Sequence, residues 1–410
     1  MSLKTENNYF SVFICCFIII TQYYEYAFLN FISVKLSTYF FHSKNLLKNL
    51  GYIFILYSIG TFIAKSCGSI IFGFIADIFG LNIAIKIPPF ITLIASCIFI
   101  FSPSYNDIGY YAIILFIIAR ILFQISVSGE IDNTRLYIGK LLKTKMSESF
   151  VLMCKYIGIF LSLAMNVFIE YYNLLFQFGF VIAAICTFIA IFLRSYLYII
   201  PTINNNDKSI LNIIYSIYDN RLNFIYQIIL YGLIGSTGYF HITFTKIYLV
   251  DVLKTMPSNF HLMNIFFLPF AVFLAGLIPF SSLFKQAISF MIINILILIT
   301  IIYNIYHDNY PIYLIILSTS CTAFFHIPLL QLSKSLLPQK CEATFLSTSH
   351  SIGSIIFSQT TIVIGLKLWE TYNIQWLPYI YPIIFILLGM ILISVQYYYH
   401  NSNNISNSIC

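Results

Sequence analysis

The sequence predicts an all-α integral membrane protein built from about twelve hydrophobic helices. Of its 410 residues, 60% are hydrophobic and only 9% are charged, and the mean hydropathy is +0.89. A soluble domain carries about 25% charged residues, because water must solvate its surface. The apolar residues also form continuous runs instead of alternating with polar ones, which favours helices over a β-barrel. Most of the surface is therefore expected to face lipid.

A helix needs about 20 apolar residues to cross roughly 30 Å of hydrocarbon. Short connectors rich in Asn, Asp, Pro and Lys separate runs of this length along the chain. The sequence therefore predicts twelve spans, over residues 10–33, 51–76, 84–102, 109–131, 149–169, 173–194, 222–245, 260–283, 287–306, 310–333, 344–366 and 377–398.

The longest polar interval within this array covers residues 201–221 and divides the spans six and six. Secondary transporters with two halves have this organisation, and their solute site lies between the halves at mid-membrane. A longer loop can also occur in any polytopic protein. We predict an N-terminal half over 1–200, a cytoplasmic linker over 201–221, a C-terminal half over 222–400 and a polar tail over 401–410.

The distribution of basic residues predicts the orientation. If the N-terminus is inside, twelve of the 21 Lys and Arg residues fall in inner segments and six in outer ones, and Lys65, Arg120 and Lys155 lie within spans. Cytoplasmic loops carry an excess of Lys and Arg, so both termini are expected to be cytoplasmic. The net charge of +7 is scattered and indicates no nucleic-acid partner. The first apolar run is too long for a cleavable signal.

The sequence contains no pattern typical of a metal site, a cofactor site or an enzyme active site. Its nine cysteines are scattered, mostly within the predicted spans, and lack the spacing of metal ligands. There is no Gly-rich phosphate loop and no serine nucleophile elbow. We therefore expect no enzyme activity, no metal and no cofactor.

The segment Gly73–Gly80, which reads G-F-I-A-D-I-F-G, follows the second predicted span. Small residues at 73 and 76 let helices approach closely. Asp77 at a helix end can accept hydrogen bonds from the first amides of a neighbouring helix, and Gly80 permits a tight turn. An ordinary helix–Asp–Gly turn would contain the same residues. The segment resembles the G-x-x-x-D-x-x-G loop of the major facilitator superfamily, which makes Gly73, Asp77 and Gly80 candidate gating-loop residues.

Further segments, in the same order along the chain, resemble the metabolite–proton symporters of that superfamily, which carry proline and betaine, citrate, ketoglutarate and shikimate in bacteria. Phe62–Gly68 resembles the F-x-x-R-P-x-G run, with Lys65 in the place of the arginine. Gln22–Ala27 resembles E-W-Y-D-F-x, with Glu25 in the place of the aspartate. Similar likenesses are found at 120–130, 194–201, 337–342 and 349–353.

The resemblance implies a secondary transporter of the bacterial inner membrane. Such a carrier would move a small zwitterionic or carboxylate solute together with protons, by alternating access. The sequence leaves the oligomeric state open, with a monomer as the expectation. The chain departs from the pattern at Ile78, Leu81 and Asn82, where the family has basic residues, and residues 276–285 lack the second loop aspartate. In these carriers the loop charges form an ionic latch. Their loss leaves open a second hypothesis, a non-transporting membrane protein with a sensory or structural role.

Charged residues inside the spans are the candidate site, because burying a charge at the bilayer centre costs roughly 2.5–3.5 kcal/mol. Glu25 can carry a coupling proton or form a static ion pair. Arg120 can hold a substrate carboxylate or pair with a carboxylate of the protein, and Lys65 can contact the solute or extend to a wetter level. Together with Gln22 and Tyr23, these are the predicted substrate or proton-coupling residues. We expect Glu25 and Arg120 to point between the halves.

For the other polar groups in the spans we mainly expect roles in charge pairing and packing. Glu130, Asp132 and Arg135 are expected to form an interfacial charge cluster. Lys155 can extend its ammonium toward the interface or line the central cavity. His241, His326 and His350 could relay protons. No carboxylate lies at helical spacing to orient them, so packing roles are expected instead.

Overall fold

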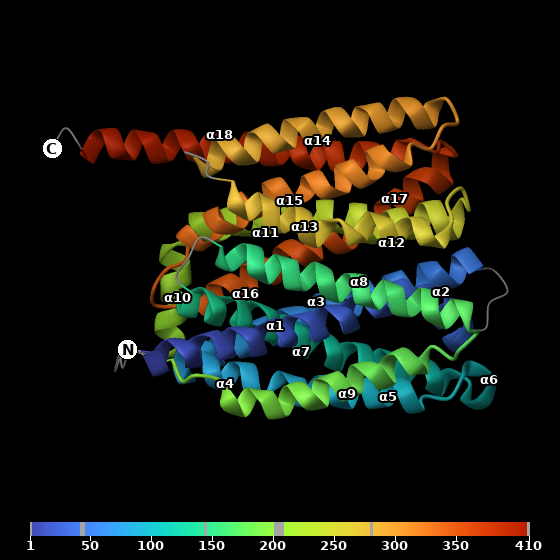
Figure 1. Ribbon diagram of the computed structural model, residues 1–410, viewed down its shortest axis with the longest axis horizontal. Coiled ribbons are helices and arrows are strands. Elements are labelled where there is room, and N and C mark those ends of the chain that lie inside the picture. The colour runs from blue at the N-terminus through green and yellow to red at the C-terminus, as the bar shows by residue number, and fades with distance from the viewer. Residues whose placement is uncertain (1, 42–45, 143–145, 201–208, 279–281, 408–410) are drawn as a thin grey trace.

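A computed structural model describes the backbone of residues 2–41, 46–142, 146–200, 209–278 and 282–407. Every regular element in these ranges is helical, as the sequence predicts. The long helices lie side by side and run in roughly the same direction (Figure 1). The chain termini, α4 and α10 lie at one end of the bundle, which we call the terminal end, whereas α2, α6 and α17 lie at the opposite end.

The described residues of the first half form nine α-helices. Gly80 separates α3 from α4 with φ of 101°, a conformation that suits glycine and makes the predicted tight turn possible. Pro88 and Pro89 begin α5, where the absent amide hydrogen of proline costs no helical hydrogen bond. The helices are α1 (Ser2–Phe31), α2 (Ser33–Phe40), α3 (Leu46–Phe79), α4 (Leu81–Lys86), α5 (Pro88–Phe101), α6 (Tyr105–Ile108), α7 (Tyr110–Leu142), α8 (Ser147–Tyr171) and α9 (Gln177–Leu193), followed by the short 3₁₀ turn η1 (Arg194–Tyr196).

The second half follows residues 201–208, which lie outside the described part of the chain. The later part of the predicted linker is a helix, α10, whose Ile213 packs with Cys341 and Phe345 at the terminal end. The helices are α10 (Ile210–Asp219), α11 (Arg221–Tyr239), α12 (Ser258–Phe266), α13 (Leu268–Leu277), α14 (Leu283–Tyr306), α15 (Ile312–Ser335), α16 (Glu342–Gly353), α17 (Gln359–Tyr372) and α18 (Ile380–Asn407). Wider π-helical turns, η2 (Phe240–Phe244) and η3 (Lys246–Val252), continue α11, η4 (Ser354–Ser358) joins α16 to α17, and the 3₁₀ turn η5 (Leu377–Tyr379) precedes α18.

Eleven helical segments in the described residues are long and apolar enough to cross a membrane, and they coincide with eleven of the twelve predicted spans. The predicted seventh span, 222–245, lies in the continuous helical segment 221–252. Polar residues such as Asn223 and Gln227 lower its hydropathy, which explains why it is not among the eleven. The chain is therefore a multi-pass membrane protein with the predicted helix order.

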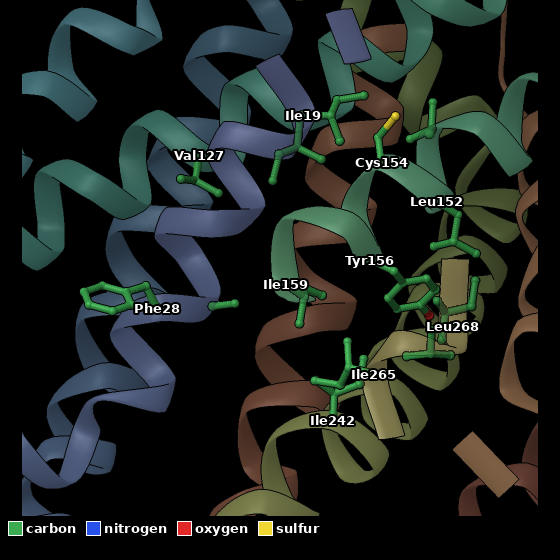
Figure 2. Close-up of a cluster of buried hydrophobic side chains, with 14 of the residues drawn as sticks. Ile19, Phe28, Val127, Leu152, Cys154, Tyr156, Ile159, Ile242, Ile265 and Leu268 are labelled. Atoms are coloured by element: carbon green, nitrogen blue, oxygen red, sulfur yellow. The ribbon is translucent and has the colours of Figure 1, made fainter. Parts of the chain in front are cut away.

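The two halves pack against each other through a few helix pairs. Contacts between α3 and α16 and between α8 and α13 are the most extensive across this interface. Tyr156 and Ile159 of α8 belong to the same cluster of buried apolar side chains as Ile242, Ile265 and Leu268 of the second half (Figure 2). These contacts are apolar and offer no hydrogen-bonding group to a solute. A binding site between the halves must therefore include the polar side chains of the interface.

The shared placement of α4 and α10 gives a testable topology. Reporter domains fused after Lys86 and after Asp219 are expected to lie on the same face of the membrane, and a reporter inserted at Gly109 on the other face, because α6 lies at the opposite end. Reporter enzyme activity or protease protection measures this. Reporters at Lys86 and Asp219 on opposite faces would contradict the arrangement of the halves.

Candidate functional site

A cavity of about 100 Å³, measured as the space open to the centre of a water molecule, lies between the two halves. Helices α1, α3, α7 and α8 of the first half and α11, η2, α16 and η4 of the second half line it. Its charged or ionisable side chains are Lys65, Asp132, Lys155 and His350. Its aromatic side chains are Tyr23, Tyr26, Phe31, Tyr231 and Tyr239.

Two of the five predicted substrate or coupling residues, Tyr23 and Lys65, line this cavity. The Lys65 ammonium donates a 2.6 Å hydrogen bond to Ser354 Oγ of η4, which joins α3 to the second half. Gln22, Glu25 and Arg120 are not among the lining residues. The roles of all five residues stay predictions. Their positions divide them into two residues that line the cavity and three that do not.

Glu25 does not point between the halves, and that expectation is wrong. Thr187 of α9, a helix of the same half, donates a 2.7 Å hydrogen bond to Glu25 Oε1, and the side chain is buried. An α-helix turns about 100° per residue, so Glu25 points about 200° away from the direction of Tyr23. The lining residues Tyr23, Tyr26, Ala27 and Asn30 share a face of α1 that excludes Glu25.

Arg120 lies deep in α7 and is only 2% exposed, so it does not face lipid. Its guanidinium carbon lies 6.0 Å from the centroid of the Tyr26 ring, at the distance of a cation–π contact. Tyr26 itself lines the cavity, and its hydroxyl bonds to that of Tyr239 across the halves. Arg120 therefore lies behind a wall of the cavity instead of in it.

Lys155 takes the second of its two predicted positions. Its side chain lines the cavity, and its Nζ lies 5.3 Å from the Tyr23 ring centroid and 5.6 Å from that of Tyr156. Two tyrosine rings thus stabilise the ammonium at the level of the cavity, instead of the alternative extension toward the interface.

The predicted interfacial cluster of Glu130, Asp132 and Arg135 does not form. Glu130 pairs with Arg194 within the first half, and Arg135 Nε pairs with Glu148 Oε2 at 2.6 Å. Asp132 faces the second half, where His350 Nδ1 lies 2.9 and 2.8 Å from its two carboxylate oxygens. His350 therefore has a carboxylate partner, which removes the reason for expecting a packing role, and its role stays a prediction. Its partner lies 218 residues away, so no local sequence pattern could reveal the pair.

Asp77 joins the two halves at the terminal end. Its carboxylate accepts hydrogen bonds from the Ala343 and Thr344 amides of α16, at 3.0 and 2.8 Å, and from the Thr344 hydroxyl at 2.7 Å. This confirms the predicted contact of Asp77 with the start of a neighbouring helix. A Cβ atom at Gly73 would lie 2.7 Å from Thr344 Cα, so glycine is required for this close approach.

Further polar contacts close the same end. Lys140 of α7 pairs with Glu342 of α16 at 2.8 Å, and Arg135 donates to Tyr231 and, at 3.3 Å, to the Leu330 carbonyl. At the opposite end the halves meet where Lys246 Nζ donates a 3.2 Å hydrogen bond to the Phe31 carbonyl. The charged contacts between the described halves are thus concentrated at the terminal end.

No family profile and no curated protein sequence matches the chain. Solved structures share its fold. The human organic anion transporter MFSD10 (TETRAN) has a TM-score of 0.70 at 11% identity and covers 94% of this chain and 99% of its own. The proton:xylose symporter XylE of the major facilitator superfamily, bound to 6-bromo-6-deoxy-D-glucose, has 0.68 at 15%, covering 94% and 95%. A variant of the E. coli fucose:proton symporter FucP has 0.67 at 10%, covering 93% and 97%. At these identities the likeness establishes the fold alone.

Proposed function

We propose that this chain, which has the major facilitator fold, is a secondary transporter that moves a small zwitterionic or carboxylate solute by alternating access. The observation that carries the proposal is a cavity between the halves that contains a few charged side chains, with breakable charged contacts at one end of it. A carrier needs such contacts, because each access state must be stabilised and then released. The solved structures with this fold are described as transporters, which supports the same reading.

The charges in the cavity support an anionic group on the solute. Lys65 and Lys155 bring two ammonium groups to the cavity, and Asp132 brings one carboxylate that His350 already contacts. Ammonium groups bind carboxylates through charge-assisted hydrogen bonds. The ring of Tyr239 and those of the other lining tyrosines could hold the cationic part of a zwitterion through cation–π contacts.

The contacts at the terminal end favour transport over the rival hypothesis of a non-transporting descendant. The family's basic loop residues are replaced by Ile78, Leu81 and Asn82. Lys140–Glu342 and Asp77 nevertheless link α7 and α3 to α16 at this end. A different set of side chains can therefore perform the task of the lost ionic latch.

Solute exchange tests the proposal. Purified protein is first screened for thermal stabilisation by amino acids, betaines and small carboxylates, because a ligand of the native state raises its apparent stability. The best ligand is then loaded into proteoliposomes, and entry of the labelled solute by exchange is measured. We expect exchange that protein-free liposomes lack. A protein that is stabilised by ligand but exchanges none would support the sensory role instead.

A further inference from the structure

Asp132 of α7 and His350 of α16 form a titratable pair that joins the two halves. The imidazole Nδ1 lies within 2.9 Å of both carboxylate oxygens of Asp132. The Asp132 side chain is 3% exposed, whereas that of His350 is 25% exposed, and both residues line the central cavity. The pair is thus reachable from the cavity and exists only while α7 and α16 stay together.

The groups around His350 are mostly cationic. Lys65 of α3 and Lys155 of α8 line the same cavity, and Arg135 of α7 lies over the Tyr231 ring at 5.6 Å. The Tyr231 ring of α11 lies 4.6 Å from the imidazole of His350, centroid to centroid. Glu148 already pairs with Arg135, which leaves Asp132 as the carboxylate in contact with His350.

The surroundings of a positive charge on the His350 imidazole therefore depend on whether the two halves are in contact. When the terminal end is closed, Asp132 compensates a proton on the imidazole directly. When α16 moves away from α7, the imidazolium loses that carboxylate, and Lys65, Lys155 and Arg135 of the first half recede with it. Asp132 is the group in direct contact with the imidazole, so the loss of its charge outweighs the relief from the more distant cations. Histidine is the side chain that exchanges a proton most readily near neutral pH, so this difference can act in the physiological range.

We propose that the Asp132–His350 pair is the proton-binding site that couples this transporter to a proton gradient, and that a bound proton stabilises closure of the terminal end. The inference rests on the proposed transport function. One proton enters from the cavity, converts the neutral imidazole to imidazolium beside the Asp132 carboxylate, and leaves when the halves separate at that end. By linkage, the state that binds the proton more tightly is the state that the proton stabilises.

Glu25, the coupling residue expected from the sequence, does not offer the same change of surroundings. Its oxygen contacts Thr187 of α9 within the same half, so separation of the halves leaves that contact in place. A proton on Glu25 would not sense which end of the cavity is open through any contact between the halves. The Asp132–His350 pair does so directly, because each half supplies one member.

The test measures the distance between the halves as a function of pH. In a cysteine-free background, Lys86→Cys and Lys340→Cys place spin labels on exposed positions of the two halves. We expect the short-distance, closed population to grow as the pH falls from 8 to 5.5 in the otherwise native protein. His350→Gln and Asp132→Asn should each abolish this pH dependence. His307→Gln, which changes an exposed histidine in the turn after α14, should retain it.

Transport assays on the same variants separate this inference from the proposed function. The accumulation that an imposed proton gradient drives is divided by the exchange rate of the same variant. This ratio should fall for His350→Gln and stay native for His307→Gln. A native ratio for His350→Gln, or an unchanged pH response of its distances, would overturn the coupling site. Absence of exchange by the native protein would overturn the transport function instead, whatever the spin labels report.

Discussion

Asp77→Ala is expected to open the terminal end. The variant removes three hydrogen bonds, two of them to amides at the start of α16. Hydrogen bonds to a charged group contribute about 1.5–3 kcal/mol, which corresponds to a shift of roughly 10- to 100-fold in the ratio of open to closed protein. Alanine suits the end of α3, so the fold should persist. The spin-label pair at Lys86 and Lys340 measures the shift as a loss of the short distance.

Asp107→Ala is the matched control for this variant. Asp107 accepts hydrogen bonds from Ser104 in a capping box at the start of α6, at the opposite end and within one half. Asp107→Ala removes a carboxylate, as Asp77→Ala does, but leaves the interface between the halves unchanged. The label distances should therefore stay native. If Asp77→Ala also leaves them native, Asp77 does not hold the terminal end closed.

Loss of the cavity lysines is expected to weaken binding of carboxylate solutes strongly. Lys65→Met and Lys155→Met keep the length of the side chain but remove the ammonium, and each should raise the dissociation constant roughly 10- to 100-fold, if one charged hydrogen bond of about 1.5–3 kcal/mol is lost. The double variant should bind no carboxylate at accessible concentrations. Ligand-induced thermal stabilisation measures the change.

Two controls make this prediction specific. Lys367→Met removes an exposed lysine that pairs with Glu370 on α17, outside the cavity, and should leave solute affinity native. The amide of the same solute lacks the carboxylate, so its weaker binding should not fall further in the lysine variants. Equal loss of affinity for the acid and the amide would indicate a distorted cavity instead of a lost charge contact.

Hydrophobicity predicted the helix order because lipid imposes one simple requirement on every span. The contact of Asp77 with the start of a neighbouring helix could also be predicted. The small residues at 73 and 76 and the glycine at 80 restrict how the loop meets that helix. These features are local in the sequence. The helix order therefore follows from composition and spacing, whereas the expectation of the major facilitator fold rests on the resemblance of short segments to that superfamily.

The site was harder to predict because it depends on which face each helix turns to the other half. Tyr23, Tyr26, Ala27 and Asn30 follow the i, i+3, i+4, i+7 spacing of one helix face, and that spacing could have excluded Glu25. The resemblance of Gln22–Ala27 to a family segment favoured Glu25 instead. For Asp132 and His350 the sequence holds no such signal, because the packing of α7 against α16 brings them together.

Uptake of labelled solute into proteoliposomes under an imposed proton gradient is the decisive measurement for proton-coupled transport by this protein. We predict that a zwitterion or carboxylate which stabilises the protein accumulates above its external concentration when the outside is acidic. An uncoupler should reduce the internal concentration to equilibrium without stopping exchange. A folded, ligand-binding protein that neither accumulates nor exchanges the solute would contradict the account and identify a membrane protein that binds solute without carrying it.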